Sequence, residues 1–481
     1  MIVDELTFLI QQTFGFVPTQ EQADAINVFC RFLTDRRDRC VMILRGSAGT
    51  GKTSLASAIV KTMVKLRQKV MLLAPTGRAA KVFSLNACHP AFTIHRKIYR
   101  QKSFTGDMTG FNLNNNLHQD TLFMVDEASM IANDGFSESV SFGTGRLLDD
   151  IVSFVYSGRN CRMILIGDKA QLPPIGEAES PALMADYMAG YGLTVYQSDL
   201  NEVLRQTSDS GILYNATVIR KMITHDEITK LPKIRFKGFA DIHRVTGDEL
   251  IEQLNSSYSE VGIDETMVIT RSNKRANIYN RGIRGMVLGR EEELTTGDML
   301  MIVKNNYYWI ERERNGEESQ APLTFIANGD RAQVVRVRNL RQFYGFNFAD
   351  ILLKFPDYDN YELLATVIMD SLNSDAPALT REQNEQLFSS VMEDYSDVPL
   401  KSERLKKVKS DIYFNAVQIK YAYAVTCHKA QGGQWSHVYI DQGYMTDDML
   451  TPDYIHWLYT AFTRATDKLY LVNWQKTQID E

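Results

Sequence analysis

The sequence predicts an α/β fold built on parallel strands, and three observations support this prediction. Short apolar runs with the length of buried strands alternate with segments of helical spacing. A glycine-rich phosphate loop lies between the run from Val41 to Leu44 and a helical segment at residues 54–66. The pattern of a strand followed by a polar loop returns in the second half, in "VITRSNKRAN". The length of 481 residues allows roughly two to four domains.

The composition indicates a globular protein that does not hold nucleic acid by bulk charge. Hydrophobic residues make up 44% of the chain and the formal net charge is −6, which still permits a basic channel on an acidic surface. Five scattered cysteines without a C-x-x-C pair argue against a disulfide framework and favour a reducing cytoplasm. Asp4 and Glu5 near the start argue against a signal peptide, and no apolar run approaches the ~18 residues that span a bilayer. We therefore expect a cytoplasmic protein without a membrane partner.

The phosphate loop is the most informative segment of the chain. The pattern G-x-x-x-x-G-K-[ST] is matched by Gly46, Ser47, Ala48, Gly49, Thr50, Gly51, Lys52 and Thr53. The glycines let backbone N–H groups curl around phosphate oxygens, and the start of the following helix adds its positive dipole end. Lys52 is expected to reach the β- and γ-phosphates, and the Thr53 hydroxyl to ligate Mg²⁺. A chance glycine-rich turn is the alternative, and the strand-before, helix-after context argues against it.

Two further strand ends supply the remaining groups of a phosphate-cleaving site. "TLFMVDEASM" ends a strand in Asp126, expected to hold Mg²⁺ through its water shell, and Glu127, expected to polarise the attacking water as general base. "CRMILIGDKAQLPP" ends another strand, and Gln171 in the following loop is placed to contact the γ-phosphate. The alternatives are a capped strand end in the first case and a strand followed by a proline-bearing turn in the second.

Taken in order, these segments resemble the motif series of superfamily 1 DNA helicases, in particular the RecD, Dda and Pif-type branch. The segments that carry the resemblance are "PTQEQADAI", "GSAGTGKT", "APTGRAAK", "TIHR", "VDEASM", "GDKAQLPPI", "LNEVLRQT", "AVTCHKAQGGQW" and "LYTAFTRATDKL". They run from about Pro18 to Leu469 and so cover nearly the whole chain.

The resemblance implies an ATP-dependent DNA helicase that translocates 5′ to 3′ on single-stranded DNA and unwinds duplex DNA. The implied cofactors are ATP and Mg²⁺. The implied partners are single-stranded DNA and single-strand/duplex junctions, and the expected state is a monomer. Two alternatives stay open, an RNA helicase and a P-loop ATPase that acts without nucleic acid, because a 2′-hydroxyl preference is not readable in the sequence.

The resemblance also assigns nucleotide roles to single residues. Gln22 matches a glutamine that reads the adenine edge, and Gln171 matches the γ-phosphate sensor. Arg205 and Arg464 match two arginines that reach the γ-phosphate from the second motor domain, where a guanidinium stabilises the charge on the transferring phosphoryl group. For Arg464 the alternative is a solvated arginine on a helix face.

The stretch "AVTCHKAQGGQW" contains Cys427 beside His428. No second cysteine or histidine lies at a zinc-ligand spacing, and nothing in the sequence indicates an activated thiol. In the family this loop touches both the nucleic acid and the nucleotide cleft. Gly432 is therefore assigned to the phosphate side, where glycine permits close approach, and Cys427 to interior packing.

The loops that follow strands also provide the expected contacts to the nucleic-acid strand. These contacts are polar or positively charged and suit phosphate and sugar, which implies little sequence preference. The assigned residues are Pro75, Thr76, Gly77, Arg78, Thr93, His95, Thr270, Arg271, Asn273, Thr426, His428 and Lys429. For each of them the alternative is an ordinary capping or solvated polar residue.

The resemblance implies two RecA-like P-loop motor domains with two insertions. The first motor domain is expected at residues 1–205, and the second at 206–330 and 418–481. A β-hairpin insertion is expected at 97–120, because turn-forming residues there lie between aromatic ones. An SH3-like β-barrel is expected at 331–417, although residues 371–410 are polar, helix-leaning and match no family motif.

The expected hairpin corresponds to the pin that separates DNA strands in the family. Phe104, Met108 and Phe111 are the candidates to meet the fork. An asparagine-rich surface loop is the alternative interpretation of the same stretch.

Overall fold

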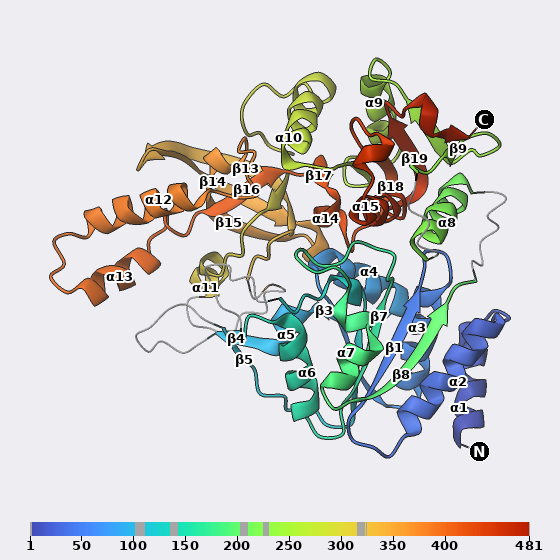
Figure 1. Cartoon of the computed structure of the whole chain (residues 1–481). Coiled ribbons are helices and arrows are strands. Elements are labelled where there is room, and N and C mark those ends of the chain that lie inside the picture. Colours follow the sequence, from blue (N-terminus) through green and yellow to red (C-terminus); the bar gives the residue numbers. More distant parts are fainter. Residues whose placement is uncertain are drawn as a thin grey trace.

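Two α/β lobes and a β-barrel make up the protein (Figure 1). The computed structural model describes residues 2–101, 111–134, 143–202, 210–224, 230–314, 323 and 325–480. In the view of Figure 1 the N-terminal lobe lies below, the second lobe lies above it on the right, and the barrel lies on the left. No helix in these residues is long and apolar enough to cross a membrane.

The first lobe is a parallel sheet with helices on both faces. The strand order is β3-β2-β6-β7-β1-β8, with Val41 opposite Met163. The strands are β1 (Cys40–Gly46), β2 (Lys69–Ala74), β3 (Ala91–Thr93), β6 (Thr121–Val125), β7 (Arg162–Gly167) and β8 (Thr194–Leu200). The helices are α1 (Ile2–Phe14), α2 (Gln20–Thr34), α3 (Lys52–Lys65), α4 (Gly77–Ala87), α5 (Ile94–Ile98), α6 (Leu147–Ser157) and α7 (Ala185–Gly190), with the short turns η1 (Ala128–Met130) and η2 (Pro181–Leu183).

The alternation of side chains along β1 divides the core of this lobe into two halves. Met42 and Leu44 pack with α1, α2 and α3 on one face, and Val41 and Ile43 pack with α6 and α7 on the other. Because both faces are covered, β1 is apolar at every central position, as expected for a strand of a parallel sheet.

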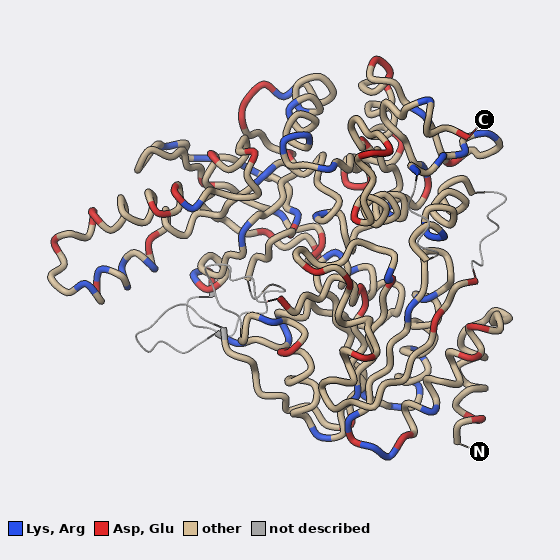
Figure 2. Tube along the Cα trace, viewed as in Figure 1, with Lys and Arg blue, Asp and Glu red and all other residues tan. Residues whose placement is uncertain are grey.

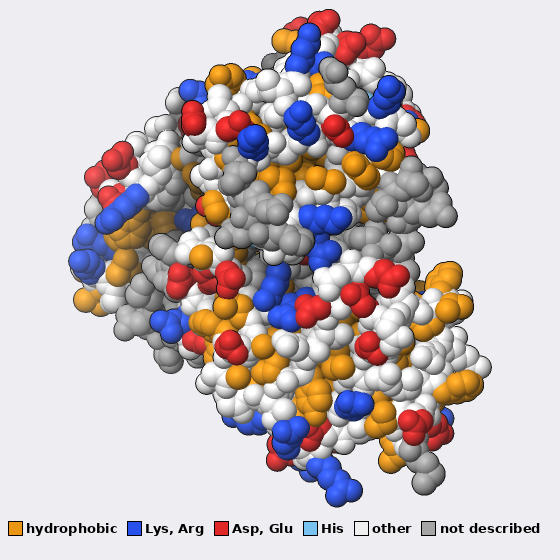
Figure 3. Space-filling model, turned by 45° about the vertical axis from the view of Figure 1, so that its right-hand side comes forward, with side chains coloured by type: hydrophobic (Ala, Val, Ile, Leu, Met, Phe, Trp, Pro, Cys, Tyr) orange, Lys and Arg blue, Asp and Glu red, His pale blue; other side chains and the backbone are white. Residues whose placement is uncertain are grey.

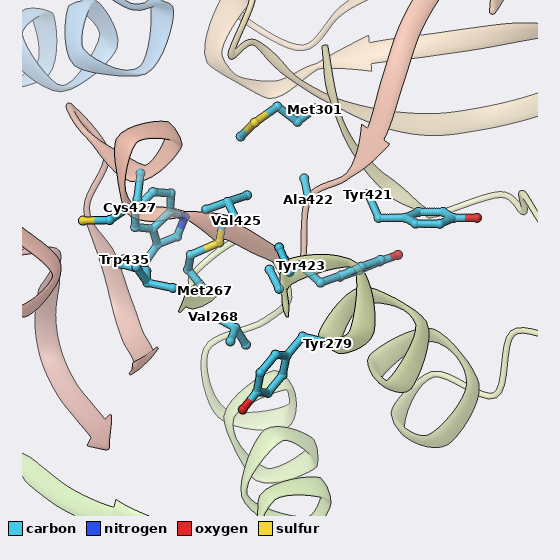
Figure 4. Packing of buried hydrophobic residues seen from close by; sticks show 14 of the residues in the cluster. Met267, Val268, Tyr279, Met301, Tyr421, Ala422, Tyr423, Val425, Cys427 and Trp435 are labelled. Carbon is cyan, nitrogen blue, oxygen red and sulfur yellow. The ribbon is translucent and has the colours of Figure 1, made fainter. Parts of the chain in front are cut away.

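The second lobe repeats this architecture with the strand order β10-β19-β18-β11-β17. Its strands are β10 (Ile242–Val245), β11 (Thr266–Thr270), β17 (Ala424–Thr426), β18 (Trp435–Asp441) and β19 (Ala465–Val472), with the small pair β9 (Ile234–Arg235) and β20 (Ile479–Asp480). Its helices are α8 (Gly211–Thr224), α9 (Leu250–Glu260), α10 (Asn273–Gly282), α14 (Cys427–Ala430) and α15 (Pro452–Phe462), with the turns η3 (Ile283–Val287), η6 (Asp447–Met449) and η7 (Lys476–Gln478). Met267, Val425, Cys427 and Trp435 belong to its core (Figure 4).

A closed barrel is inserted between β11 and β17. Its strands are β12 (Met299–Ile302), β13 (Arg331–Phe343), β14 (Phe346–Phe355), β15 (Tyr361–Ile368) and β16 (Val417–Tyr421), with α11 (Tyr308–Arg314), η4 (Pro356–Tyr358) and η5 (Met369–Ser371) beside them. The barrel therefore extends beyond the expected 331–417, because β12 pairs with both β13 and β16. A short apolar run such as "MLMI" does not indicate which sheet it joins.

The segment without a family motif forms a helical hairpin on the barrel. It consists of α12 (Arg381–Asp394), which begins with a capping box of Thr380 and Gln383, and α13 (Lys401–Lys409). Leu387, Val391 and Val408 pack against Phe348 of β14 and form a separate small core. The helical hairpin is therefore packed on the barrel through its own hydrophobic core.

The expected hairpin insertion is represented by a short antiparallel pair. β4 (Tyr99–Gln101) pairs with β5 (Phe111–Leu113), with Tyr99 opposite Leu113. Phe104 and Met108 lie outside the described residues, as does the side chain of Phe111. Which residue would meet a fork stays a prediction.

The barrel also touches the first lobe. The turn η4 between β14 and β15 lies on the start of α4, where a Cβ atom at Gly77 would be 2.3 Å from the Tyr358 hydroxyl. Lys81 donates to the backbone oxygen of Pro356 at 2.6 Å. The second lobe and its barrel thus hold the first lobe at two separate places, the barrel tip and the cleft described next.

Candidate functional site

The phosphate loop connects β1 to α3 and is closed by its own lysine. Gly49 and Gly51 have φ values of 78° and 82°, in the left-handed region that favours glycine. Lys52 Nζ donates to the backbone oxygens of Gly46, at 2.6 Å, and Ser47, at 2.8 Å. A Cβ at Gly46 would lie 2.8 Å from Thr50 Oγ1, so the loop is too tight there for any other residue. The geometry is that of a loop prepared to surround phosphate, with a cation at its mouth.

Gln22 supports this loop from α2. Its amide oxygen accepts from the Thr19 backbone N–H at 3.1 Å, and its amide nitrogen donates to the backbone oxygen of Thr50 at 3.0 Å. The side chain is buried and both ends of the amide are engaged within the protein. An adenine contact by Gln22 would therefore require these bonds to exchange, and it stays a prediction.

The two acids predicted to serve hydrolysis follow β6 directly. Glu127 has a φ of 50°, an uncommon value for a residue other than glycine, and its backbone N–H donates to Asp126 Oδ1 at 2.9 Å. Burial, followed by the neighbouring Glu127 carboxylate, raises the pKa of Asp126 to about 7. A cation bound beside Asp126 would favour its charged form and so offset this shift of the pKa.

The residues present fit a magnesium ion held together with a nucleotide. Thr53 is exposed in the first turn of α3, and Asp126 supplies an oxygen ligand at the end of the neighbouring strand β6. Mg²⁺ is usually bound by one or two protein oxygens, substrate phosphates and water. Across the described residues no group of three or more His, Cys, Asp or Glu side chains could hold a metal alone.

Gln171 lies in the loop after β7, and its side-chain oxygen can still accept a hydrogen bond. Its backbone N–H donates to the Asp168 backbone oxygen at 3.3 Å, which tightens the loop. Its side-chain oxygen Oε1 is buried and has no hydrogen-bond partner among the described residues. An unpaired buried amide oxygen is costly, so the site favours a donor such as a water molecule.

Helix α15 of the second lobe lies against this part of the first lobe. The Tyr459 hydroxyl donates to Asp168 Oδ2 at 2.7 Å and accepts from the Ala48 backbone N–H at 3.1 Å. Burial, followed by the Asp168 carboxylate, raises the pKa of Tyr459 well above its usual value. The Tyr459 hydroxyl of the second lobe therefore accepts a hydrogen bond from a backbone N–H of the phosphate loop in the first lobe.

Further bonds join the same two elements. The Leu172 backbone N–H donates to Thr460 Oγ1 at 2.8 Å, and Gln431 Nε2 donates to the Leu172 backbone oxygen at 2.7 Å. His456 Nδ1 lies 2.9 Å from the backbone oxygen of Ala170. The loop after β7 is thus hydrogen-bonded to α15 on one side and to the loop after α14 on the other.

Arg464 follows α15 and lies close to Glu127. It is only 2% exposed, and its guanidinium is held by the backbone oxygens of Thr460, at 3.1 Å, and Gly433, at 3.2 Å. Its NH1 atom is 4.0 Å from Glu127 Oε1 across the cleft. The position fits an arginine that reaches a γ-phosphate. Arg205 lies outside the described residues, so its role stays a prediction.

Arg220 is a functional candidate that the sequence did not reveal. From α8 of the second lobe its NH1 donates to Ser47 Oγ in the phosphate loop at 2.8 Å, and its NH2 donates to Asn201 Oδ1 at 2.5 Å. In the sequence Arg220 is an ordinary arginine beside the buried Ile219 on an amphipathic helix. Figure 3 shows Lys and Arg side chains gathered at the level where the two lobes meet.

The residues predicted to contact nucleic acid gather at the carboxyl ends of parallel strands. Thr76 and Thr93 cap α4 and α5 after β2 and β3, and Asn273 begins α10 after β11. Gly432 permits the two lobes to approach, because a Cβ there would lie 3.1 Å from Thr76 Oγ1. The loop with Thr76 in the first lobe and the loop with Gly432 in the second therefore lie in contact, near the carboxyl ends of their strands.

One predicted contact does not fit the structure. Thr270 is fully buried, and its hydroxyl donates to the backbone oxygen of Ser272 at 3.1 Å. It is the last residue of β11, so its side chain serves the strand-to-helix turn and has no surface for a nucleic acid.

Arg78 and Gly77 belong to a joint between the lobes. The Arg78 guanidinium donates to the Gln434 backbone oxygen at 2.5 Å and lies 4.9 Å from the centroid of the Trp435 ring. Gly77 is covered by Tyr358. Contacts of these two residues with a strand would compete with these interactions, whereas half-buried Pro75 keeps part of its surface.

The two predicted histidines differ in exposure, because the His95 side chain is half-buried and the His428 side chain is exposed. Burial lowers the pKa of His95 to about 4 and lowers the pKa of His428 as well. The His95 ring lies 5.6 Å from the Tyr99 ring and 6.2 Å from the Phe325 ring, measured between centroids. Neutral imidazoles can offer a strand a hydrogen bond but no charge.

A small pocket of about 20 Å³ lies at the carboxyl ends of the second lobe's strands. Asn273, Thr426 and Lys429 line it together with barrel residues such as Met301 and Lys420. Arg271 lies nearby over the Tyr454 ring, 5.4 Å from its centroid. The pocket brings three predicted strand contacts together where the barrel meets the lobe.

Cys427 is part of the core. It is fully buried, its Sγ lies 3.5 Å from the Trp457 backbone oxygen, and burial raises the pKa of the thiol to about 12. A thiol with a raised pKa is a poor nucleophile and a poor metal ligand. The interpretation as interior packing agrees with this environment.

Two family models match the chain, one in each lobe. A model described as an AAA domain covers residues 18–231, and a model described as a UvrD-like helicase C-terminal domain covers residues 421–472. The first match contains the phosphate loop, Asp126, Glu127 and Gln171. The second match contains α15 and Arg464.

Three relatives are similar over different lengths. An uncharacterized protein of Acanthamoeba polyphaga mimivirus is 24% identical over 519 residues, covering 94% of this chain and 98% of the relative. The ATP-dependent DNA helicase Dda of Enterobacteria phage T4 is 24% identical over 293 residues, covering 59% of this chain and 60% of Dda. The ATP-dependent RecD2 DNA helicase of Deinococcus radiodurans is 29% identical over 179 residues, covering 37% of this chain and 21% of the relative.

Solved structures of Pif1 helicases are similar over nearly the full length. A structure of Pif1 helicases at forked double-stranded DNA covers 97% of this chain and 95% of that chain, with 16% identity and a TM-score of 0.47. Bacteroides Pif1 in complex with ADP-AlF3 and single-stranded DNA has the same coverage, with 15% identity and a TM-score of 0.46.

Proposed function

We propose that this chain, which belongs to the superfamily 1 helicases of the RecD, Dda and Pif-type branch, moves 5′ to 3′ along single-stranded DNA and so unwinds duplex DNA. ATP hydrolysis drives this movement. The observation that carries this proposal is the meeting of two lobes at one phosphate loop. Arg220, Tyr459 and Arg464 from the second lobe all lie at the nucleotide cleft of the first.

The chemistry at the cleft is hydrolysis of the γ-phosphate. Glu127 accepts a proton from the attacking water, whose oxygen bonds to the γ-phosphorus while the bond to the β–γ bridging oxygen breaks and ADP leaves with the electron pair. Lys52 and Arg464 stabilise the charge on the phosphoryl oxygens, and Gln171 orients the water or the γ-phosphate. Magnesium, held through Thr53 and Asp126, would supply further charge neutralisation there.

The coupling of this reaction to movement rests on contacts across the cleft. With ATP bound, the γ-phosphate attracts the arginines of the second lobe and keeps the cleft closed, and its loss on hydrolysis weakens that attraction. Both lobes carry strand-binding loops at the same edge, so alternate opening and closing moves them along a strand in turn. Each step is a population shift biased by one phosphate group.

The partners follow from the chemistry of that edge. Hydroxyls, backbone groups and charges suit phosphate and sugar, and the relatives Dda and RecD2 are described as DNA helicases. Single-stranded DNA and single-strand/duplex junctions are thus the proposed ligands, bound by a monomer. All five cysteines are free, which supports the cytoplasm as the place of action.

Unwinding of forked duplexes with either a 5′ or a 3′ tail, in the presence of ATP and Mg²⁺, tests the proposal. We expect unwinding of the 5′-tailed fork, ATP turnover that rises on addition of single-stranded DNA, and loss of both in Lys52→Ala. A preference for the 3′ tail would contradict the polarity alone. Turnover that responds to RNA but not DNA would favour an RNA helicase, and turnover without response to either would favour a different P-loop ATPase.

A further inference from the structure

Helix α13 carries an unusual concentration of positive charge. Its sequence "KSERLKKVK" contains five basic residues and one acidic residue, in a chain with a net charge of −6. Its partner helix α12 is rich in acidic residues, and Figure 2 shows the acidic colour along α12 and the basic colour along α13. The helical hairpin of α12 and α13 thus carries negative charge on one helix and positive charge on the other. An anionic ligand would approach it from the side of α13.

Some side chains of α13 pack against the rest of the protein, whereas two of its lysines remain exposed. Val408 is fully buried, and the Arg404 guanidinium donates to the backbone oxygen of Val398 at 2.5 Å. Lys407 lies over the Tyr395 ring, with its Nζ 5.5 Å from the centroid. Lys406 and Lys409 are exposed, and no carboxylate in the described part of the chain pairs with either side chain.

The basic end of α13 contacts α11, which is connected in turn to the strand pair β4 and β5. The backbone oxygen of Ser410 accepts from the Tyr308 hydroxyl of α11 at 3.0 Å. Beside Tyr308, the Tyr307 ring lies 4.8 Å from the Phe325 ring, and Phe325 packs against His95, which packs against Tyr99 of β4. Tyr308 of α11 therefore contacts the end of α13, and its chain neighbour Tyr307 is connected through Phe325 and His95 to Tyr99 of β4.

Helix α11 adds charge at the same place. Arg312 is exposed, and its guanidinium lies over the rings of Tyr308 and Trp309, 5.9 and 5.3 Å from their centroids. Stacking fixes the guanidinium at the surface without neutralising it. Arg312 lies beside the end of α13, because its NH1 is 3.5 Å from the Tyr308 hydroxyl that bonds to Ser410, and the neighbouring Glu311 and Glu313 offset part of its charge.

We propose that this surface, formed by Arg312, Lys406 and Lys409, binds the phosphate backbone of the duplex ahead of the fork. The proposal rests on the helicase function proposed above and adds a partner surface to it. Two features favour duplex over single-stranded DNA. Helix α13 offers no aromatic side chain on which a base could stack, and surfaces that bind single strands normally do. Nine helical residues are also a rigid rod of about 13 Å, which matches about four base pairs of B-DNA.

The test compares the double variant Lys406→Ala/Lys409→Ala with the wild type and with the control Lys61→Ala/Lys65→Ala, which removes two exposed lysines from α3. Binding is measured without nucleotide on a fork with a duplex arm and on a single strand alone, over a range of salt concentrations. We expect the variant to bind the fork about tenfold more weakly at low salt, with a salt slope lower by about two, because two phosphate contacts are lost. Single-strand affinity and DNA-stimulated ATP turnover should match those of the wild type and the control.

Unchanged fork binding in the variant would overturn the proposal. Equal losses on the fork and on the single strand would overturn it too, because the surface would then belong to the single-strand track. An equal loss in the control would show a general charge effect. Absence of DNA-stimulated ATP turnover in the wild type would instead refute the proposed function, and the binding measurement judges the surface separately.

Discussion

At the scale of single residues, Asp126 links the site to pH. Its pKa of about 7 follows from burial and from Glu127 beside it, so the group is largely protonated below pH 7 and must lose its proton to hold Mg²⁺. Binding of Mg·ADP should thus release close to one proton near pH 6 and little near pH 8, and affinity should weaken as pH falls through 7. Calorimetry in buffers of different ionisation enthalpy measures the released protons.

Asp126→Asn is the matched comparison for this measurement. It removes the titrating group while keeping the shape of the side chain. Any proton uptake or release by the nucleotide itself persists in the variant and is subtracted. The same proton count in the wild type and in Asp126→Asn would contradict the assignment of this group.

A second prediction at the residue scale concerns the effect of Arg220 on ATP turnover. Because its guanidinium bridges Ser47 and Asn201 across the cleft, Arg220→Ala should lower kcat/KM for ATP by roughly 10- to 100-fold, the range for a lost charged hydrogen bond. Arg220→Lys keeps the charge without the planar fork and should recover only part of the loss. Steady-state kinetics with Lys221→Ala, one position along the same helix, as the control tests this.

A rise in KM alone would show that Arg220 binds the nucleotide equally before and during the reaction. Equal falls in kcat and kcat/KM would show that it acts in the transition state. An Arg220→Ala variant as active as Lys221→Ala would contradict any role at the nucleotide.

At the scale of elements, α15 is one of the parts that join the two lobes. Tyr459→Phe removes one hydroxyl and leaves Ala48 N–H and Asp168 Oδ2 without their partner in the other lobe. A loss of about 1–1.5 kcal/mol would lower the ratio of closed to open molecules by roughly 5- to 15-fold. Energy transfer between dyes on α7 and α9 reports this ratio, with Tyr444→Phe at an exposed site as the control. An unchanged ratio would mean that the hydroxyl does not hold the cleft.

Elements whose signals are local could be predicted from the sequence. The phosphate loop, its strand and its helix are adjacent in the chain, and the polar, helix-leaning stretch at 371–410 indeed holds α12 and α13. The membership of β12 in the barrel could not be predicted, because its partners in β13 and β16 are distant in sequence. Pairing over such separations leaves no periodic trace in the strand itself.

The same limit applies to site residues. Thr270 follows an apolar run like other candidates, yet the end of β11 turns it inward. Arg220 became visible only when folding placed α8 beside the phosphate loop. Motifs therefore identify residues that share a loop with the ligand, and they miss residues that arrive from a separate helix.

At the scale of the whole molecule, the contact between the barrel tip and α4 has its own test. In Gly77→Ala the new Cβ would overlap the Tyr358 hydroxyl, which donates to the buried Asp330 at 2.8 Å. Displacing this hydroxyl should destabilise the protein by about 1–3 kcal/mol and lower the thermal midpoint by several degrees. Gly190→Ala is the control, because a Cβ there meets nothing within 4 Å.

A second substitution shows whether the two residues act on each other. Tyr358→Ala makes room for the new methyl group, so Gly77→Ala should cost little in that background. If the costs of the two substitutions simply added, the contact would not be the cause of the instability.

The short connection between β16 and β17 has a mechanical meaning. β16 ends at Tyr421 and β17 begins at Ala424, so the barrel is fastened to the second lobe's sheet almost without slack. A rotation of that sheet must therefore carry the barrel and its helices α12 and α13 with it. Because Pro356 and Tyr358 of the same barrel contact α4, such a rotation would also have to shift the barrel's contact with the first lobe.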